Sequence, residues 1–114
     1  MKKIKIKQQD YENMSIDQLE YLLMIRGDNK TKVYDKIRQL NRQWNKTLTS
    51  DACQHCGYNK HVELAHLKGI NAFDKYTLLK EINHPDNILV LCRNCHWEYD
   101  SGMLELIEIG LRKQ

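Results

Sequence analysis

Four cysteines stand in two matched pairs, Cys53-x-x-Cys56 and Cys92-x-x-Cys95, with 35 residues between the pairs. Two residues between thiolates allow both sulfurs of a pair to bind one tetrahedral ion, and two pairs complete a four-sulfur site. We expect structural zinc, because a closed four-thiolate site leaves no coordination position for substrate. Spacing alone leaves an iron–sulfur cluster open. Disulfides would need an oxidising compartment, of which the sequence gives no sign.

Three further polar residues lie between and just after these pairs. His66 ends a Glu-Leu-Ala-His run, Asn87 opens the apolar run that leads to Cys92, and His96 directly follows the last cysteine. Each residue is a weak signal by itself, since a single histidine in a strand is more often structural than catalytic. Together, in this order and within a double cysteine pair, they resemble the HNH endonuclease family over residues 51–102.

The resemblance implies an α+β fold of the ββα-metal (His-Me finger) type, clamped by the four-cysteine zinc site. It also implies one catalytic divalent cation. His66 would be the general base that deprotonates the attacking water, and a neutral imidazole suits this work because its unperturbed pKa lies near working pH. Asn87 would fix the loop between the strands and help to orient the histidine. His96 would be a ligand of the catalytic cation.

The second ligand of that cation is open. Many relatives carry Asp or His directly before the base, whereas this chain has Ala65, which cannot bind a metal. Asp100 lies one helical turn after His96, so both side chains can face the same ion. Glu63, on the same side of the strand as Ala65, is an alternative ligand, and a weakly bound cation is the third interpretation. The ion can be Mg²⁺, Mn²⁺, Ni²⁺ or Zn²⁺, since histidine and carboxylate ligands admit several.

Apolar runs and turn residues predict the elements that position these groups. In the second half we expect a strand over 62–67, a helical turn over 76–82, a turn over 83–87, a strand over 88–91, a helix over 93–100 that Gly102 ends, and a helix or strand over 103–109. We expect Trp97 and Tyr99, on the last helix, to pack against the small core rather than to stack on bases.

The first half predicts two helices. Ser15 and Gln18 form a capping-box pattern ahead of an apolar run, and Gly27 is placed to end that helix. A second helix is expected from Thr31 to Trp44, because its apolar residues are spaced by 4, 3 and 4 and so form one stripe. Residues 1–14 indicate a polar arm with a short strand at Ile4–Ile6.

Charge divides the chain into the same two parts. Residues 1–50 carry 11 Lys and Arg against 6 Asp and Glu, so we expect a basic arm with two helices there and an HNH nuclease domain over 51–114. Basic residues displace counterions from nucleic acids, although a solvated helix face has the same composition. The candidate nucleic-acid contacts are Lys32, Lys36, Arg38, Arg42, Lys68 and Arg93.

We therefore predict a metal-dependent endonuclease that hydrolyses DNA phosphodiester bonds, as in phage or restriction systems. A monomer would nick one strand, and a homodimer could cut both. The alternatives are a zinc-dependent nucleic-acid-binding module without catalysis, which Ala65 favours, and a structural zinc module that binds another protein. No stretch approaches the roughly 18 apolar residues of a membrane span, and no signal-peptide core follows the basic start, so we expect a reducing cytoplasmic location.

Overall fold

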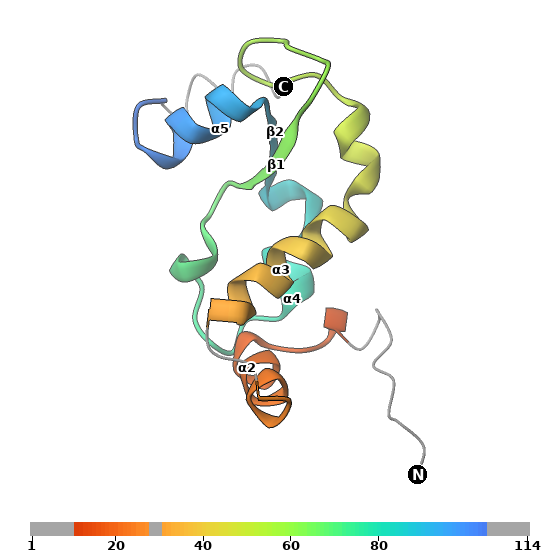
Figure 1. Cartoon of the computed structure of the whole chain (residues 1–114), viewed down its shortest axis with the longest axis vertical. Coiled ribbons are helices and arrows are strands. Elements are labelled where there is room, and N and C mark those ends of the chain that lie inside the picture. Colours follow the sequence, from red (N-terminus) through yellow and green to blue (C-terminus); the bar gives the residue numbers. More distant parts are fainter. Residues whose placement is uncertain (1–10, 28–30, 105–114) are drawn as a thin grey trace.

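The computed structural model describes residues 11–27 and 31–104 (Figure 1). The strand predicted at Ile4–Ile6 and most of segment 103–109 lie outside the described residues. In Figure 1 the helices α2, α3 and α4 lie together in the lower part, and α5 lies with the sheet in the upper part. The elements are α2 (Ile16–Ile25), α3 (Thr31–Trp44), β1 (Glu63–His66), α4 (Leu79–Ile82), β2 (Ile88–Leu91) and α5 (Arg93–Asp100), with 3-10 turns at Lys46–Ser50, Ile70–Ala72 and Pro85–Asn87.

The first long helix begins and ends as its sequence predicts. The Gln18 N–H donates to the Ser15 hydroxyl oxygen over 3.2 Å, and the Ser15 N–H donates to the Gln18 side chain over 2.9 Å. These two bonds satisfy amide groups that the first turn of a helix leaves without partners. Gly27 follows the helix with φ of 87°, a conformation that glycine adopts without steric cost. The capping box and the glycine stop are confirmed.

The sheet consists of two short antiparallel strands whose register determines the rest of the site. Leu64 stands opposite Val90, and His66 stands opposite Ile88. The outer edge of β2 is covered by Gln54, because the Val90 N–H donates to the Gln54 side-chain Oε1 over 2.6 Å and the Val90 carbonyl accepts from the Gln54 N–H over 2.8 Å. Since these groups of Val90 point away from β1, Leu64 and His66 turn their own backbone groups toward the outer edge of β1.

Two apolar clusters hold the elements together. The first cluster joins α2 and α3 to α4 and the turn at Ile70, with Ile37, Leu79 and Ile82 fully buried. The second packs three of the four cysteines, Ala65 and alternate residues of β2 against α5, and Cys56 is exposed. The first cluster thus takes side chains from both sides of residue 50, so the N-terminal helices and the cysteine-rich half pack against each other.

Several predicted elements differ from the observed ones in detail. The first strand is confined to Glu63–His66, and the predicted turn over 76–82 contains α4 only at its end. Trp97 is 63% exposed, so the prediction that it packs against the core is wrong. Tyr99 does pack against the second cluster, and its hydroxyl donates to the Leu67 carbonyl over 2.7 Å. No helix among the described residues is long and apolar enough to cross a membrane.

We predict that Leu79→Ala lowers the free energy of unfolding by about 2–5 kcal/mol, because it removes a fully buried side chain where α4 meets the N-terminal helices. Chemical denaturation followed by circular dichroism measures the change. The matched control is Glu81→Ala, on the exposed side of the same helix. A second transition for the N-terminal helices alone would contradict a shared core.

Candidate active site

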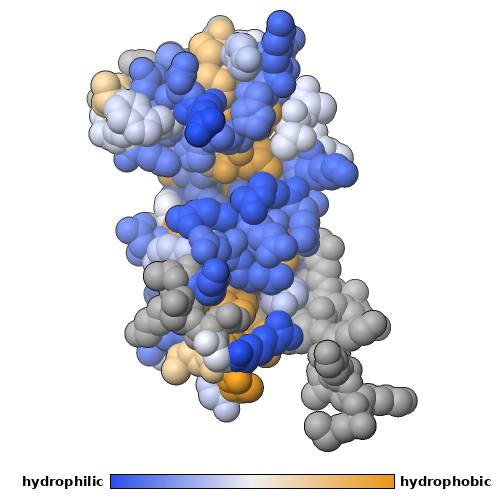
Figure 2. All heavy atoms as spheres, in the orientation of Figure 1, coloured by the Kyte–Doolittle hydropathy of each residue, from blue (hydrophilic) through white to orange (hydrophobic). Residues whose placement is uncertain are grey.

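Three of the residues expected to act together, His66, His96 and Asp100, line one cleft of about 330 Å³ beside β1. His66 and Ala65 enter it from β1, and His96 and Asp100 enter it from α5. The N-terminal half contributes Tyr34 and Arg38 from α3. Figure 2 shows that the face seen there is largely hydrophilic across the middle of the molecule. The cleft therefore combines two histidines, a carboxylate and a guanidinium in one space.

His66 is half-buried, and one of its ring nitrogens is already engaged. Its Nε2 lies 2.8 Å from the side-chain oxygen Oδ1 of Asn83. Burial lowers the pKa of His66 below its usual value of 6.5; the bond to Asn83 opposes this change, and the nearby positive charge of Arg38 adds to it. A lowered pKa keeps the ring neutral, and thus able to accept a proton, at neutral pH.

Asn87 ties together the loops that flank the cleft. Its side-chain oxygen accepts from the Lys68 N–H over 2.8 Å, and its Nδ2 donates to the Ile82 carbonyl over 2.8 Å and to the Lys68 carbonyl over 3.2 Å. Its backbone carbonyl accepts from the Leu67 N–H over 2.7 Å. These bonds fasten the end of β1 to the end of α4. Asn87 therefore stabilises the loops beside the cleft, and none of these bonds reaches the His66 ring.

His96 is held between two carboxylates, one on each ring nitrogen. Its Nδ1 lies 2.8 Å from Oε1 of Glu63, and its Nε2 lies 3.2 Å from Oδ2 of Asp100. The bond to His96 lowers the pKa of Glu63, against the opposing effect of burial, so Glu63 is an anion that accepts this bond. The two carboxylates lie in different hollows. Asp100 lines the cleft together with His66, whereas Glu63 lines the adjoining hollow.

Ala65 is almost completely buried, at 1% exposure, in the cluster that contains the cysteines. Its neighbours leave it a packing role, and its methyl group offers no ligand atom. Glu63, two residues earlier on the same face of β1, brings a carboxylate to α5 instead. Position 65 has no carboxylate, but Glu63 and Asp100 each place one against a ring nitrogen of His96.

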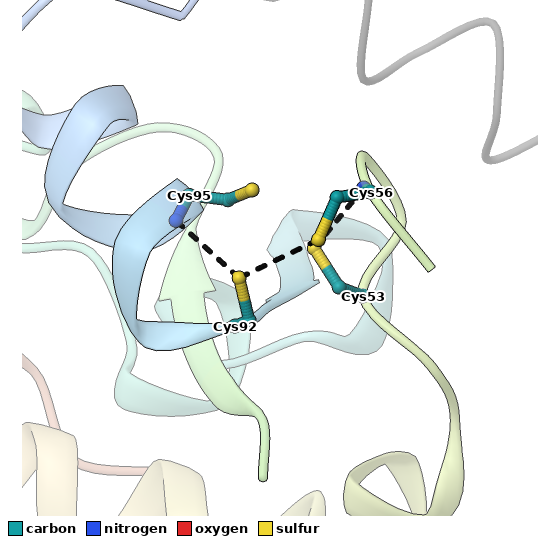
Figure 3. A group of neighbouring side chains, drawn as sticks. All are labelled: Cys53, Cys56, Cys92 and Cys95. Atoms are coloured by element: carbon teal, nitrogen blue, oxygen red, sulfur yellow. Dashed lines mark hydrogen bonds between the residues drawn. The ribbon is translucent and has the colours of Figure 1, made fainter. Parts of the chain in front are cut away.

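The four cysteines lie together, Cys53 and Cys56 in the loop before β1 and Cys92 and Cys95 at the start of α5 (Figure 3). None forms a disulfide, and the four Sγ atoms lie within 4.8 Å of one another, with Cys56 and Cys92 3.6 Å apart. Ligands about 2.3 Å from a tetrahedral ion stand about 3.8 Å apart, so one ion fits among them. In the described part of the chain, these cysteines are the one such group of three or more His, Cys, Asp or Glu side chains.

The surroundings favour the thiolate form at one of these cysteines. Burial raises the pKa of Cys53, but hydrogen bonds from the backbone near Cys56, Cys92 and His55 outweigh it and bring the value to about 6. His55 is half-buried and places its Nδ1 3.4 Å from the sulfur of Cys95. A hollow of about 590 Å³ lies beside the cluster and is lined by Arg93 among others.

The basic residues singled out in the sequence divide into separate groups. Arg38 lines the cleft, and both Arg38 and Arg42 line the hollow that adjoins it. Lys32 and Lys36 line a further groove along α3, which Arg42 also borders. Lys68 lies over the ring of Phe73, 4.5 Å from its centre. Arg93 stands beside the cysteines. The α3 residues thus form a basic path that leads into the cleft, and Lys68 and Arg93 lie elsewhere.

Sequence reasoning missed Tyr34, which lines this cleft, and the buried Asn83, which contacts His66. Asn83 precedes a His-Pro pair and resembles an ordinary turn residue, so its bond to His66 has no local signal. Tyr34 lies in the cleft because α3 packs with α4 and Ile70 in the first cluster, which is a tertiary effect. Glu63 was considered only as a possible cation ligand, whereas its position also allows it to orient His96.

Residues 53–106 match the family model described as HNH endonuclease. Searches of curated proteins and of solved structures gave no match. The matched segment includes both cysteine pairs, both cleft histidines and Asn87. It excludes α3, which supplies Tyr34 and Arg38 to the cleft.

We predict that Cys56→Ser reduces bound metal from one ion per chain and lowers the melting temperature, because three thiolates hold a tetrahedral ion less tightly than four. Cys56 is exposed, so little packing is lost. Elemental analysis and thermal denaturation measure both effects, with Asn59→Ala in the same exposed loop as control. Full metal content in the serine variant would contradict the four-sulfur site.

Proposed function

Because residues 53–106 belong to the HNH endonuclease family, we propose that the chain is a metal-dependent endonuclease that hydrolyses phosphodiester bonds in DNA. The observation that carries the proposal is the shared cleft of His66, His96 and Asp100, with Arg38 beside them. A half-buried neutral base, a candidate cation site and a fixed positive charge are what hydrolysis of a phosphodiester requires. In this reading, the two strands and α5 are the ββα-metal core of the family.

The four cysteines hold a structural zinc ion in this proposal. A closed sulfur site leaves no position for water or substrate, so the ion has no part in the reaction. Cys92 and Cys95 lie at the start of α5, and Cys53 and Cys56 lie in the loop before β1. Zinc would therefore fix α5 against β1, and with it the distance between His96 and His66.

The catalytic cation would be held by His96, through Nε2, and by Asp100. These two ligand atoms are 3.2 Å apart, and neighbouring ligands about 2.1 Å from an octahedral ion stand about 3 Å apart. Glu63 then accepts a hydrogen bond from His96 Nδ1, as carboxylates commonly do behind a metal-binding histidine. When bound, the cation neutralises charge on the phosphate and stabilises the leaving 3′ oxygen. Two protein ligands leave the remaining positions to water and phosphate.

His66 is the proposed general base. Its Nε2 is engaged by Asn83, so its Nδ1 is the nitrogen that can take a proton from water. The proton passes to Nδ1 while the water oxygen forms a bond to phosphorus and the bond to the 3′ oxygen breaks. Its lowered pKa leaves the ring unprotonated before the reaction. The products are a 3′ hydroxyl and a 5′ phosphate.

Arg38 is the proposed contact to the scissile or a neighbouring phosphate. It belongs to both the cleft and the adjoining hollow, and its guanidinium can bind two phosphate oxygens at once. Arg42, one helical turn later, and the lysines of α3 would continue the contact along the backbone of the substrate. One cleft cuts one strand, so a single chain is expected to nick duplex DNA.

Ala65 offers no ligand atom to a cation, and this favours a second candidate, a module that binds nucleic acid without cutting it. The ligand missing at this position would then leave the cation site too weak to act. The carboxylates of Glu63 and Asp100 beside His96 argue for the nuclease. The two candidates differ in whether bound DNA is cleaved.

We predict that His66→Ala reduces nicking of supercoiled plasmid by at least about 100-fold while structural zinc and DNA binding are retained, since it removes only the base. Gel assays with Mg²⁺ or Mn²⁺ measure cleavage. The matched control is His84→Ala, which removes an exposed histidine from a nearby turn and should cleave at the wild-type rate. Binding of DNA without cleavage by the wild type under every metal would favour the binding module.

We predict that Arg38→Gln lowers kcat/KM by roughly 10–100-fold, the worth of one hydrogen bond to a charged group, and weakens the salt dependence of DNA binding. Lys60→Gln removes the same charge from an exposed loop position and is the control. Equal cleavage rates and equal salt slopes in the two variants would show that Arg38 does not contact phosphate.

A further inference from the structure

A chain of buried amides runs from α3 to the base. Asn41, Asn45 and Asn83 are 1%, 4% and 2% exposed, respectively. The side-chain nitrogen of Asn45 donates to Asn41 Oδ1 over 2.7 Å and to the backbone carbonyl of Asn83 over 2.8 Å. Asn83 in turn contacts His66. Buried amides are retained where their hydrogen bonds are satisfied, and these have partners that lead to the cleft.

The bonds of Asn83 fix which way round its side chain lies. Its Nδ2 donates over 3.0 Å to the backbone carbonyl of Ile37, a group that can only accept. The opposite orientation would place two oxygens against each other. Oδ1 therefore faces His66, and since a carbonyl oxygen cannot donate, the hydrogen in the 2.8 Å contact must be on Nε2 of the imidazole.

We propose that Asn83 is a positioning residue that locks His66 in the tautomer protonated at Nε2, leaving the lone pair of Nδ1 for the attacking water. The proposal deepens the proposed function, because it names what makes His66 a base at one defined nitrogen. A histidine in the other tautomer would present a donor where an acceptor is needed, and such errors cost catalysis heavily even when the geometry is kept.

The same bonds make α3 part of the site, although this helix lies outside the segment that matches the family. Ile37 supplies the carbonyl that orients Asn83, and the next residue, Arg38, lines the cleft. Ile37 is itself fully buried in the first cluster, which fixes its place in the fold. The packing of α3 on α4 thus fixes the orientation of Asn83, and Asn83 in turn determines which nitrogen of His66 carries the hydrogen.

The first experiment observes that proton directly. Nitrogen-15 NMR at neutral pH should show His66, identified by the signals lost in His66→Ala, with its hydrogen on Nε2 and with a visible Hε2 signal protected from exchange by burial and the bond to Asn83. This measurement needs no nuclease activity, so it stands even if the chain does not cut DNA. A hydrogen on Nδ1 in the wild type would overturn the proposal.

The second experiment compares a substitution of Asn83 with one of a buried polar residue outside the amide chain. Asn83→Leu should lose the Hε2 signal and about 10–100-fold in cleavage rate, whereas Ser15→Ala, which removes the buried hydroxyl that caps α2, should keep both. Asn83→Asp retains an acceptor toward His66 and should recover the Hε2 signal that the leucine variant loses. If Asn83→Leu keeps the wild-type signal, or if Ser15→Ala loses it as well, the lock is refuted and Asn83 is a packing residue only.

Discussion

The antiparallel pairing of β1 with β2 is the constraint on which the rest of the structure depends. Each strand has only four residues, too few to be stable alone, so both depend on packing from either side. The register turns one face of β1, with Glu63 and Ala65, toward α5 and the cysteines. The other face, with His66, meets Asn83 and the N-terminal helices. One short strand therefore packs through Ala65 in the second cluster, contacts Asn83 through His66, and carries a side chain of the site on each face.

Each of the two cleft histidines has one ring nitrogen hydrogen-bonded to a side-chain oxygen. Asn83 accepts from His66, and Glu63 accepts from His96. The neutral amide leaves His66 a modest base, whereas the carboxylate makes His96 a stronger electron donor, which suits a metal ligand. Under the proposed function, these different partners would suit His66 to act as a base and His96 to bind the cation. Glu63 would then orient His96 without itself binding the cation.

The residues whose roles depend on local pattern could be predicted from the sequence. The cysteine pairs, the capping box at Ser15 and the helix over 93–100 follow from spacing within a few residues, and the structure has all three. Asn83 and Tyr34 could not be predicted, because their roles arise only when α3 packs against α4. Trp97 was predicted to pack against the core, but α5 turns Cys95 and Tyr99 toward the second cluster and leaves Trp97 exposed.

The central claim is that this cleft hydrolyses phosphodiester bonds with a bound cation, and the most direct test is the chemistry of the products. Purified wild-type chain, with its structural metal intact, is incubated with supercoiled plasmid and Mg²⁺ or Mn²⁺, and a parallel sample contains excess EDTA. The account predicts nicked circles only with the cation, and it predicts that DNA ligase reseals them, since water attack with loss of the 3′ oxygen leaves a 3′ hydroxyl and a 5′ phosphate. Plasmid that stays intact with every divalent metal, or nicks that ligase cannot reseal, would contradict it.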